Sequence, residues 1–428
     1  MEIFILIVSF IVLVGIRVPI AWSIGIASLL TILFSIDSIA AFTTISQRVV
    51  TGLDSFSLLA IPFFILAGHI MNSGGIAKRL IEFAKSLVGS LPGGLAQVNI
   101  VAAMMFGAIA GSAGAAAAAI GSFMSERMEK EGYTKEYGVA VNVTAATTGL
   151  LIPPSNIFII YSLASGGVSI GALFLAGYIP GILTGLILMI IAFIWAKRKG
   201  FPTSKRSSAS HVFKSFIDAL PSLLLLIIII GGIVAGIFTA TEASSVAVVY
   251  CLVLAFLYKE LTFSGLKDVL VQSVGTISLV MLLIAMSIAM SWVMSYENIP
   301  QDITSSLLSF SDNPIVVMIL INLILLFVGI FMDMTPAVLI FTPIFLPVAI
   351  AMGIDPVHFG VIMILNLCIG LCTPPVGAVL FIGVGVAGTT IQKVIKPLLP
   401  LFVGMLFSLI LVIIFPSLSL WLPRFFGF

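Results

Sequence analysis

The sequence has very little charge. Only 8% of its 428 residues are Asp, Glu, Lys or Arg, whereas 61% are hydrophobic, and the mean hydropathy is +1.29. Because soluble globular domains carry about 25% charged residues, a soluble fold is excluded. The length suffices for roughly a dozen membrane segments of about 20 residues each. We therefore predict an all-α polytopic membrane protein, with residues 1–16 as a first membrane segment rather than a removed signal.

Cysteine and histidine are equally scarce, with three of each. Cys251, Cys368 and Cys372 lie in apolar segments, and their odd number argues against a disulfide framework. The sequence has no metal-ligand cluster, Walker loop, nucleophile elbow or H-E-x-x-H motif. The chain is therefore predicted not to be an enzyme, to hold no organic cofactor and no metal other than a coupling Na⁺, and to have no nucleic-acid partner.

Against this background, a double proline occurs twice, 221 positions apart (374 minus 153). The first copy is GLLIPPS, with Pro153 and Pro154, and the second is GLCTPPV, with Pro374 and Pro375. Proline breaks a helix and leaves backbone groups without partners. In lipid this is tolerated only where those groups are buried in protein or line a cavity. Paired broken helices in two halves of a membrane chain indicate the binding site of a transporter.

The same offset extends beyond the prolines, since Gly15 matches Gly236 and Ser23 matches Ser244. The polar, basic stretch that separates the two halves is the natural boundary. We predict a first repeat at 1–196, a cytoplasmic linker at 197–214 and a second repeat at 215–428.

Each half is predicted to hold about five membrane spans and one re-entrant helical hairpin. The hairpins are inferred because two long apolar intervals have helix-weakening centres, at 111–114 and 333–336. The alternative for each interval is one full span followed by a surface helix. The first half is expected to have spans near 3–16, 19–36 and 55–73, a hairpin at 95–131, a broken helix at 137–165 and a span at 170–196. The second half is expected to have spans near 219–238, 240–258 and 273–296, a hairpin at 314–353, a broken helix at 358–386 and a span at 392–416.

Four further stretches mix polar and apolar residues and are expected to be either interfacial helices or plain loops. They are residues 37–54, 74–90, 259–271 and 298–312.

The distribution of basic residues favours the hairpins. If both are re-entrant, only Arg48 and Arg424 of the 19 Lys and Arg residues fall outside, which leaves 17 (19 minus 2) in the cytoplasm. Both termini are then periplasmic. An odd number of spans per half inverts the second repeat relative to the first. The hairpin at 95–131 would enter from the cytoplasm and the hairpin at 314–353 from outside.

A hairpin tip and a broken helix of the same half can meet near mid-membrane. Carbonyl and hydroxyl oxygens there suit Na⁺, whereas the amides of helix N-termini suit a carboxylate. Because the breaks and tips contain a single acid, a proton relay is less favoured than Na⁺ coupling. One Na⁺ is predicted among Ser112, Gly149, Ile152 and Pro154, and a second among Gly329, Asp333, Gly370 and Thr373.

Alternatives stay open for several of these positions. An intramembrane carboxylate such as Asp333 indicates function, with helix capping as its alternative. The glycines could serve close helix packing instead. For the substrate we predict contacts from Ser155, Asn156 and Thr335, and the first two could simply cap a helix.

The tips GSAGAAAAAIGSF and FMDMTPAVLIFTP, with the breaks IPPSN and TPPVG, resemble the large membrane subunit of tripartite ATP-independent periplasmic (TRAP) transporters over essentially the whole chain. The sequence looks most similar to sialic acid members. The resemblance implies an elevator-type, Na⁺-driven importer of a small organic acid in the lipid of a bacterial inner membrane. It also implies a small membrane subunit, expected as a separate chain, and a periplasmic substrate-binding protein.

Two other functions are compatible with the sequence. One is a stand-alone Na⁺/dicarboxylate symporter of the same superfamily. The other, from a different class, is an ion channel or a structural membrane partner.

Overall fold

The computed structural model describes residues 2–73, 75–201, 208–311 and 313–428, and every regular element in these ranges is helical. Helices are expected because a chain in lipid must satisfy its backbone hydrogen bonds within each segment. Eight of the described helices are long and apolar enough to cross a membrane, and the bent pair α8–α9 makes a ninth. The prediction of an all-α polytopic membrane protein is confirmed.

The chain up to Val234 contains eleven α-helices and two short 3₁₀ turns. They are α1 (Glu2–Gly15), α2 (Ile20–Ile32), α3 (Ser38–Thr51), η1 (Phe56–Leu59), α4 (Ala60–Ser73), α5 (Ile76–Val88), α6 (Gly94–Ala110), α7 (Ala113–Lys130), α8 (Lys135–Thr148), η2 (Gly149–Leu151), α9 (Asn156–Ala164), α10 (Ile170–Lys199) and α11 (Ala209–Val234).

Nine further α-helices follow. They are α12 (Ala240–Leu257), α13 (Phe263–Tyr296), α14 (Ile299–Phe310), α15 (Pro314–Phe331), α16 (Met334–Ala351), α17 (Pro356–Gly370), α18 (Ala378–Ala387), α19 (Ile391–Ile414) and α20 (Ser417–Phe425).

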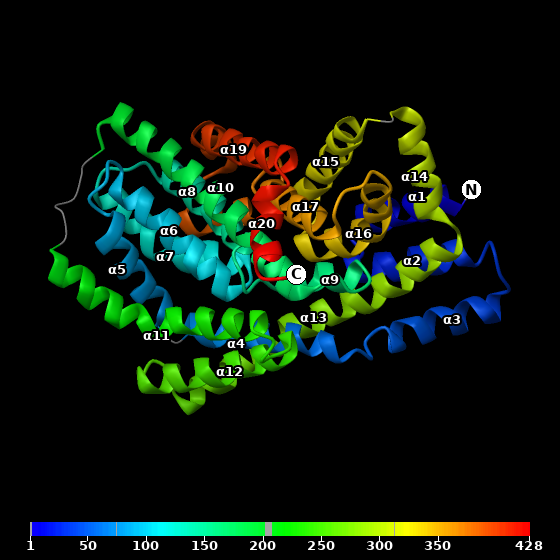
Figure 1. The fold of residues 1–428 in the computed structure, drawn as a ribbon, viewed down its shortest axis with the longest axis horizontal. Helices are drawn as coiled ribbons and strands as arrows, with labels where there is room; N and C mark the ends of the chain where they lie inside the picture. Colours follow the sequence, from blue (N-terminus) through cyan, green and yellow to red (C-terminus); the bar gives the residue numbers. More distant parts are fainter. Residues whose placement is uncertain (1, 74, 202–207, 312) are drawn as a thin grey trace.

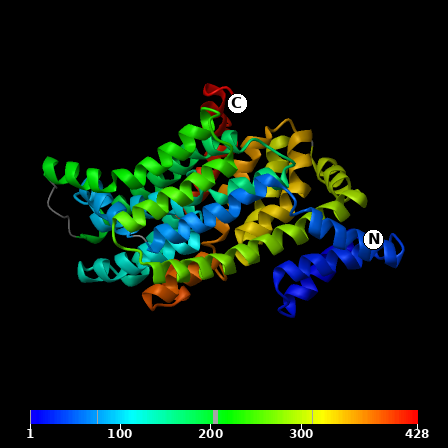
Figure 2. The same ribbon diagram turned by 90° about the horizontal axis from the view of Figure 1, so that it is seen from below.

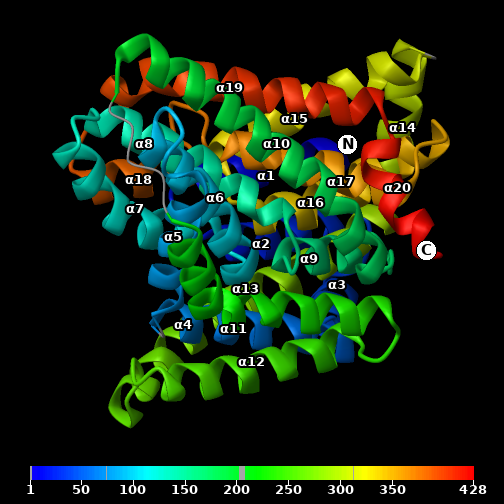
Figure 3. The same cartoon turned by 60° about the vertical axis from the view of Figure 1, so that its left-hand side comes forward.

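The helices form two layers. One, called the scaffold layer, contains α1–α5 and α11–α14, and in it α4 packs on α12 and α13. The other, called the site layer, contains α6–α10 and α15–α20. Figures 1 and 3 show α4, α11 and α12 along one edge of the molecule and α19 along the opposite edge. The layers meet where α4 contacts α6 and α9, where α5 contacts α6, and where α13 and α14 contact α16.

Each long interval predicted as a hairpin is a helix, a two-residue turn and a second helix. The turns are Gly111–Ser112, called tip 1, and Met332–Asp333, called tip 2. Across the halves, α7 packs on α18 and α16 packs on α9. By length and composition alone, α15 and α16 could each span a membrane. The repeat boundaries, the re-entrant path and the inverted orientation therefore stay predictions.

Three boundaries differ from the predicted ones. The span expected to begin at 273 is part of α13, which runs without interruption from Phe263 to Tyr296. Helix α13 therefore includes residues 263–271 of the stretch that was expected to be a separate helix or a loop. Figure 2 shows α13 in yellow-green as one continuous rod. Thr262 caps α13 early, since its hydroxyl accepts a hydrogen bond from the Gly265 N–H group at 3.1 Å. The stretches 37–54, 74–90 and 298–312 do contain separate helices.

The second difference concerns the linker predicted at 197–214. Helix α10 continues to Lys199 and α11 begins at Ala209 after a Ser208 cap, because both ends add polar turns to apolar spans. Lys205 and Arg206, which the prediction also used, lie outside the described residues. The third difference is α20, which follows Pro416 and was not predicted.

Candidate functional site

The two hairpin tips differ in local structure. At tip 1, Gly111 has a φ of 61°, a conformation that glycine adopts without strain, and Ser112 is extended. The Ser112 hydroxyl accepts a hydrogen bond from the Ala115 N–H group at 3.2 Å and so caps α7. At tip 2, Asp333 occupies the equivalent N-cap position of α16 but makes no capping hydrogen bond with its side chain. The capping alternative for Asp333 therefore has no support in this geometry.

The two breaks carry the double prolines. The first break, Ile152–Ser155, separates α8 and η2 from α9, and the two helical pieces are bent by 52°. The second break, Leu371–Gly377, separates α17 from α18. In the second break, Gly377 has a φ of 57° and its N–H group donates to the Ile330 carbonyl at 3.0 Å. This bond ties the second break directly to the hairpin beside it.

The glycines that recur in both halves lie at helix crossings. A Cβ atom on Gly149 would lie 2.9 Å from the Gly107 Cα atom, and a Cβ atom on Gly370 would lie 2.6 Å from the Gly329 Cα atom. In each half the first hairpin helix therefore touches the broken helix backbone to backbone. Packing accounts for the side-chain identity of these glycines. Ligation of Na⁺ by their carbonyl groups stays a prediction.

Both tips open onto one cavity of about 350 Å³, which lies between the two layers. The site layer contributes the two tips and the start of α9, and the scaffold layer contributes α4 and α13. The polar side chains that line it are His69, Asn72, Ser112, Asn156, Thr276, Asp333 and Thr335.

The structure divides the eleven predicted site residues into two groups. Ser112, Asp333, Asn156 and Thr335 line the cavity. The other seven lie behind its wall, in the breaks and the glycine crossings: Gly149, Ile152, Pro154, Ser155, Gly329, Gly370 and Thr373.

Two of the residues behind the wall have informative hydroxyl groups. Ser155 is 1% exposed, and its hydroxyl has no hydrogen-bond partner among the described residues. A buried hydroxyl without a partner is costly, so this oxygen is available to an ion or a water molecule. The Thr373 hydroxyl instead donates to the Ile369 carbonyl at 2.7 Å and retains its lone pairs as acceptors.

Asn156 joins the first break to tip 1. A Cβ atom on Gly111 would lie 2.7 Å from the Asn156 Nδ2 atom, so the amide group rests against the tip backbone. Asn156 opens α9, and its side chain faces the cavity at the positive end of that helix. This place suits contact with a carboxylate.

Sequence reasoning missed the scaffold side of the cavity. His69, Asn72 and Thr276 were not among the predicted site residues. The Thr276 hydroxyl lies 3.5 Å from the His69 Nε2 atom, across the contact between α4 and α13. In α4, His69 and Asn72 interrupt an otherwise apolar run, and this is the signal that could have drawn attention to Asn72.

The electrostatics of the cavity are set by one acid and three helix ends. Among the described residues that line it, Asp333 is the one acidic group, and no Lys or Arg joins it. Helices α7, α9 and α16 all begin at the cavity wall. Their N-terminal amides favour an anion, whereas Asp333 and the hydroxyl oxygens favour a cation. The arrangement suits an anion bound together with a small hard cation.

Comparisons with known proteins agree with this architecture. The family model of the tripartite ATP-independent periplasmic transporter, DctM component, matches residues 7–418. The uncharacterized protein YgiK of Salmonella typhimurium is 54% identical over 98% of this chain and 96% of its own length. The sialic acid TRAP transporter large permease protein SiaM of Vibrio cholerae is 42% identical over 89% of each chain.

A relative named for a different substrate is almost as similar. The C4-dicarboxylate TRAP transporter large permease protein DctM of Vibrio cholerae is 41% identical over 97% of this chain and 96% of its own length. Among solved structures, the YdaH transporter of Alcanivorax borkumensis has a TM-score of 0.67 at 13% identity, with 90% of each chain covered. The YdaH likeness bears on the fold alone.

Proposed function

The chain belongs to the DctM component family of tripartite ATP-independent periplasmic transporters, and from this premise we propose that it imports a small organic acid together with Na⁺ by an elevator movement. The observation that carries the proposal is the position of the cavity. Both tips and α9 come from the site layer, and α4 and α13 come from the scaffold layer. A site carried by one layer and closed by the other suits a movement of the first along the second.

The coupling ion follows from the oxygen atoms around the tips. Asp333 and the unpartnered Ser155 hydroxyl supply oxygen ligands, which Na⁺ prefers. A proton-driven carrier needs a chain of titratable groups, and the described cavity wall offers only His69 and Asp333. Sodium is therefore the coupling ion we propose.

The composition of the cavity wall also bears on the substrate. A C4-dicarboxylate brings two negative charges, and no Lys or Arg among the described lining residues would balance them. A monocarboxylate with many hydroxyl groups would place its carboxylate at the helix N-termini and its hydroxyls against the amides and hydroxyls of the wall. Sialic acid is such a compound, as the name of SiaM also suggests. The similarity to DctM makes a C4-dicarboxylate the second candidate.

The partners in this proposal are a small membrane subunit on a separate chain and a periplasmic binding protein that delivers the acid. The proposed location of the protein is a bacterial inner membrane, with the linker in the cytoplasm and both termini in the periplasm. The same topology places Asn72 and Thr276 on the cytoplasmic side, so the cavity faces inward in this conformation.

The test is uptake by proteoliposomes that contain the assembled membrane subunits. Labelled sialic acid should accumulate only with an inward Na⁺ gradient and with the binding protein present. Replacement of external Na⁺ by K⁺ should remove uptake. Uptake without the binding protein would favour the stand-alone symporter, and preference for a C4-dicarboxylate would replace sialic acid as the substrate.

A further inference from the structure

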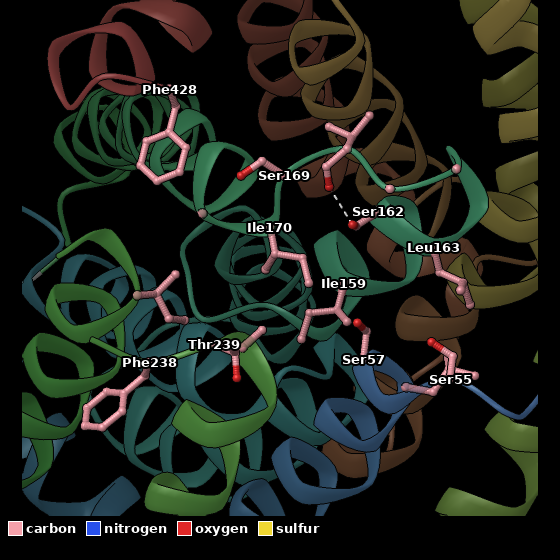
Figure 4. Close-up of a pocket in the computed structure, with 17 residues that line it drawn as sticks. Ser55, Ser57, Ile159, Ser162, Leu163, Ser169, Ile170, Phe238, Thr239 and Phe428 are labelled. Carbon is pink, nitrogen blue, oxygen red and sulfur yellow. Dashed lines mark hydrogen bonds between the residues drawn. The ribbon is translucent and has the colours of Figure 1, made fainter. Parts of the chain in front are cut away.

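A second cavity, called the outer cavity, lies at the other end of the contact between α4 and α9. Its volume is about 640 Å³, which is within the range of small-molecule pockets. Figure 4 shows Ser57 of η1 and its N-cap residue Ser55 near Ile159 and Leu163 of α9, with Thr239 and Phe428 on the left of the view. Both layers therefore line it, as they line the first cavity between the two tips, which is called the central cavity from here on.

The scaffold walls of the two cavities are repeat counterparts. The offset of 221 residues that relates the double prolines also relates Ser55 to Thr276 (276 minus 55) and Leu58 to Leu279 (279 minus 58). Ser55 and Leu58 line the outer cavity, whereas Thr276 and Leu279 line the central cavity. Ser57 likewise matches Ser278. The same short pattern of hydroxyl and leucine thus occurs at both cavities.

With the predicted topology, these two segments lie on opposite sides of the membrane. Helix α4 starts outside at η1, and α13 enters from the cytoplasm below Thr276. In a transporter with inverted repeats, the two end states interchange the conformations of the halves. A residue that lines the site in the inward-facing state then has a counterpart that lines it in the outward-facing state.

We propose that Ser55 and Leu58 are the scaffold residues that line the substrate site in the outward-facing state, where they take the places of Thr276 and Leu279. The outer cavity is the space into which tip 1 moves, and the Ser55 hydroxyl contacts the organic acid there. This inference rests on the proposed function and adds to it the outer contact residues.

Two observations support the movement. Ser55 is half-buried and Ser57 is exposed, and both line the outer cavity, so their hydroxyls are accessible to a ligand there. In addition, Met286 and Met290 of α13 pack in one cluster with Ile340 of α16. Methionine side chains are unbranched and adapt easily to new neighbours. They suit a surface along which α16 slides.

Cross-linking of matched cysteine pairs tests the proposal. The outer pair is Ser55→Cys with Ala113→Cys, and the inner pair is its repeat counterpart, Thr276→Cys with Met334→Cys. The native cysteines are all buried. The control is the chain that contains only these native cysteines and no engineered pair. A short bifunctional methanethiosulfonate is added to the assembled transporter, first at rest and then during Na⁺-driven uptake with the binding protein present.

We expect the inner pair to link at rest and the outer pair to link only during uptake. The outer link should stop uptake, and a reductant should restore it. If the outer pair never links in vesicles that are accumulating substrate, the proposal is wrong. If wild-type vesicles accumulate no organic acid under any gradient, the proposed function fails instead.

A substitution provides a second, independent readout. Ser55→Trp should fill the outer cavity and lower uptake by at least about tenfold, with assembly of the membrane subunits retained. Phe56→Trp is the matched control, because Phe56 is 68% exposed and lies outside the cavity wall, and it should leave uptake close to wild type. Normal uptake by Ser55→Trp would contradict the proposal.

Discussion

Tip 1 and tip 2 occupy equivalent places in the two halves and face the same cavity, yet their side chains serve different purposes. Ser112 accepts a hydrogen bond from the Ala115 N–H group of its own helix, whereas the Asp333 side chain makes no such capping bond. The neutral tip is thus held by an internal hydrogen bond. The acidic tip keeps its carboxylate out of a cap, and its backbone differs as well, since Gly111 has a φ of 61° and Met332 a φ of -113°. Equivalent places in the two halves therefore differ in both conformation and chemistry.

Removal of the free carboxylate should have the largest effect on this comparison. If Asp333 is a ligand of the proposed coupling Na⁺, Asp333→Ala is expected to lower uptake roughly 100-fold, because the substitution removes a charged ligand. Insertion and assembly should be unchanged, since the carboxylate makes no capping bond. Uptake of labelled acid by proteoliposomes measures the effect.

Asp302→Ala is the matched control for this substitution, because Asp302 is an exposed acid on α14 outside the cavity. It should transport like wild type. Equal uptake by Asp333→Ala and Asp302→Ala would reduce Asp333 to a bystander.

The glycine crossings allow a comparison of packing in the two halves. Gly370→Ala should destabilise the protein by about 1–3 kcal/mol, because its Cβ atom would overlap the backbone of Gly329. Gly149→Ala should cost less, since its nearest contact is 2.9 Å rather than 2.6 Å. Thermal unfolding of the purified protein in detergent gives the order.

Gly231→Ala, on α11, is the control for both glycine substitutions. Nothing lies within 4 Å of the position that its Cβ atom would take, so helix propensity should leave stability equal or slightly higher. A reversed order of Gly370→Ala and Gly149→Ala would show that the two crossings are not packed as described.

The smallest expected effect concerns the cap at tip 1. Ser112→Ala should cost about 1 kcal/mol of stability through loss of the N-cap. Asp333→Ala should cost less, since it removes no cap bond. Thermal unfolding again separates the two, and equal losses would mean that both side chains cap their helices.

Local signals in the sequence located both tips approximately. Glycine, serine, aspartate and proline in the middle of apolar runs are unfavourable in a lipid-exposed helix, and the predicted centres at 111–114 and 333–336 overlap the turns Gly111–Ser112 and Met332–Asp333. The breaks were equally clear, because proline has no N–H group to donate.

Contacts between distant helices were not recognisable in this way. Gly107 was not singled out as the partner of Gly149, since any of many small residues in the chain could have faced it. Thr276 was likewise missed, because its role depends on the pairing of α4 with α13. The length of α13 escaped prediction as well, since a polar first turn looks like a separate interfacial helix.

The sequence alone determined the class and the positions of the breaks, and it predicts the repeat. Each of these follows from local chemistry, namely the cost of charge in lipid and the effect of proline on a helix. Only the tertiary structure decided which oxygens face the cavity, that Gly149 and Gly370 pack against other glycines, and that α4 and α13 close the site. Those outcomes depend on how helices far apart in the chain cross each other, which residue types alone do not specify.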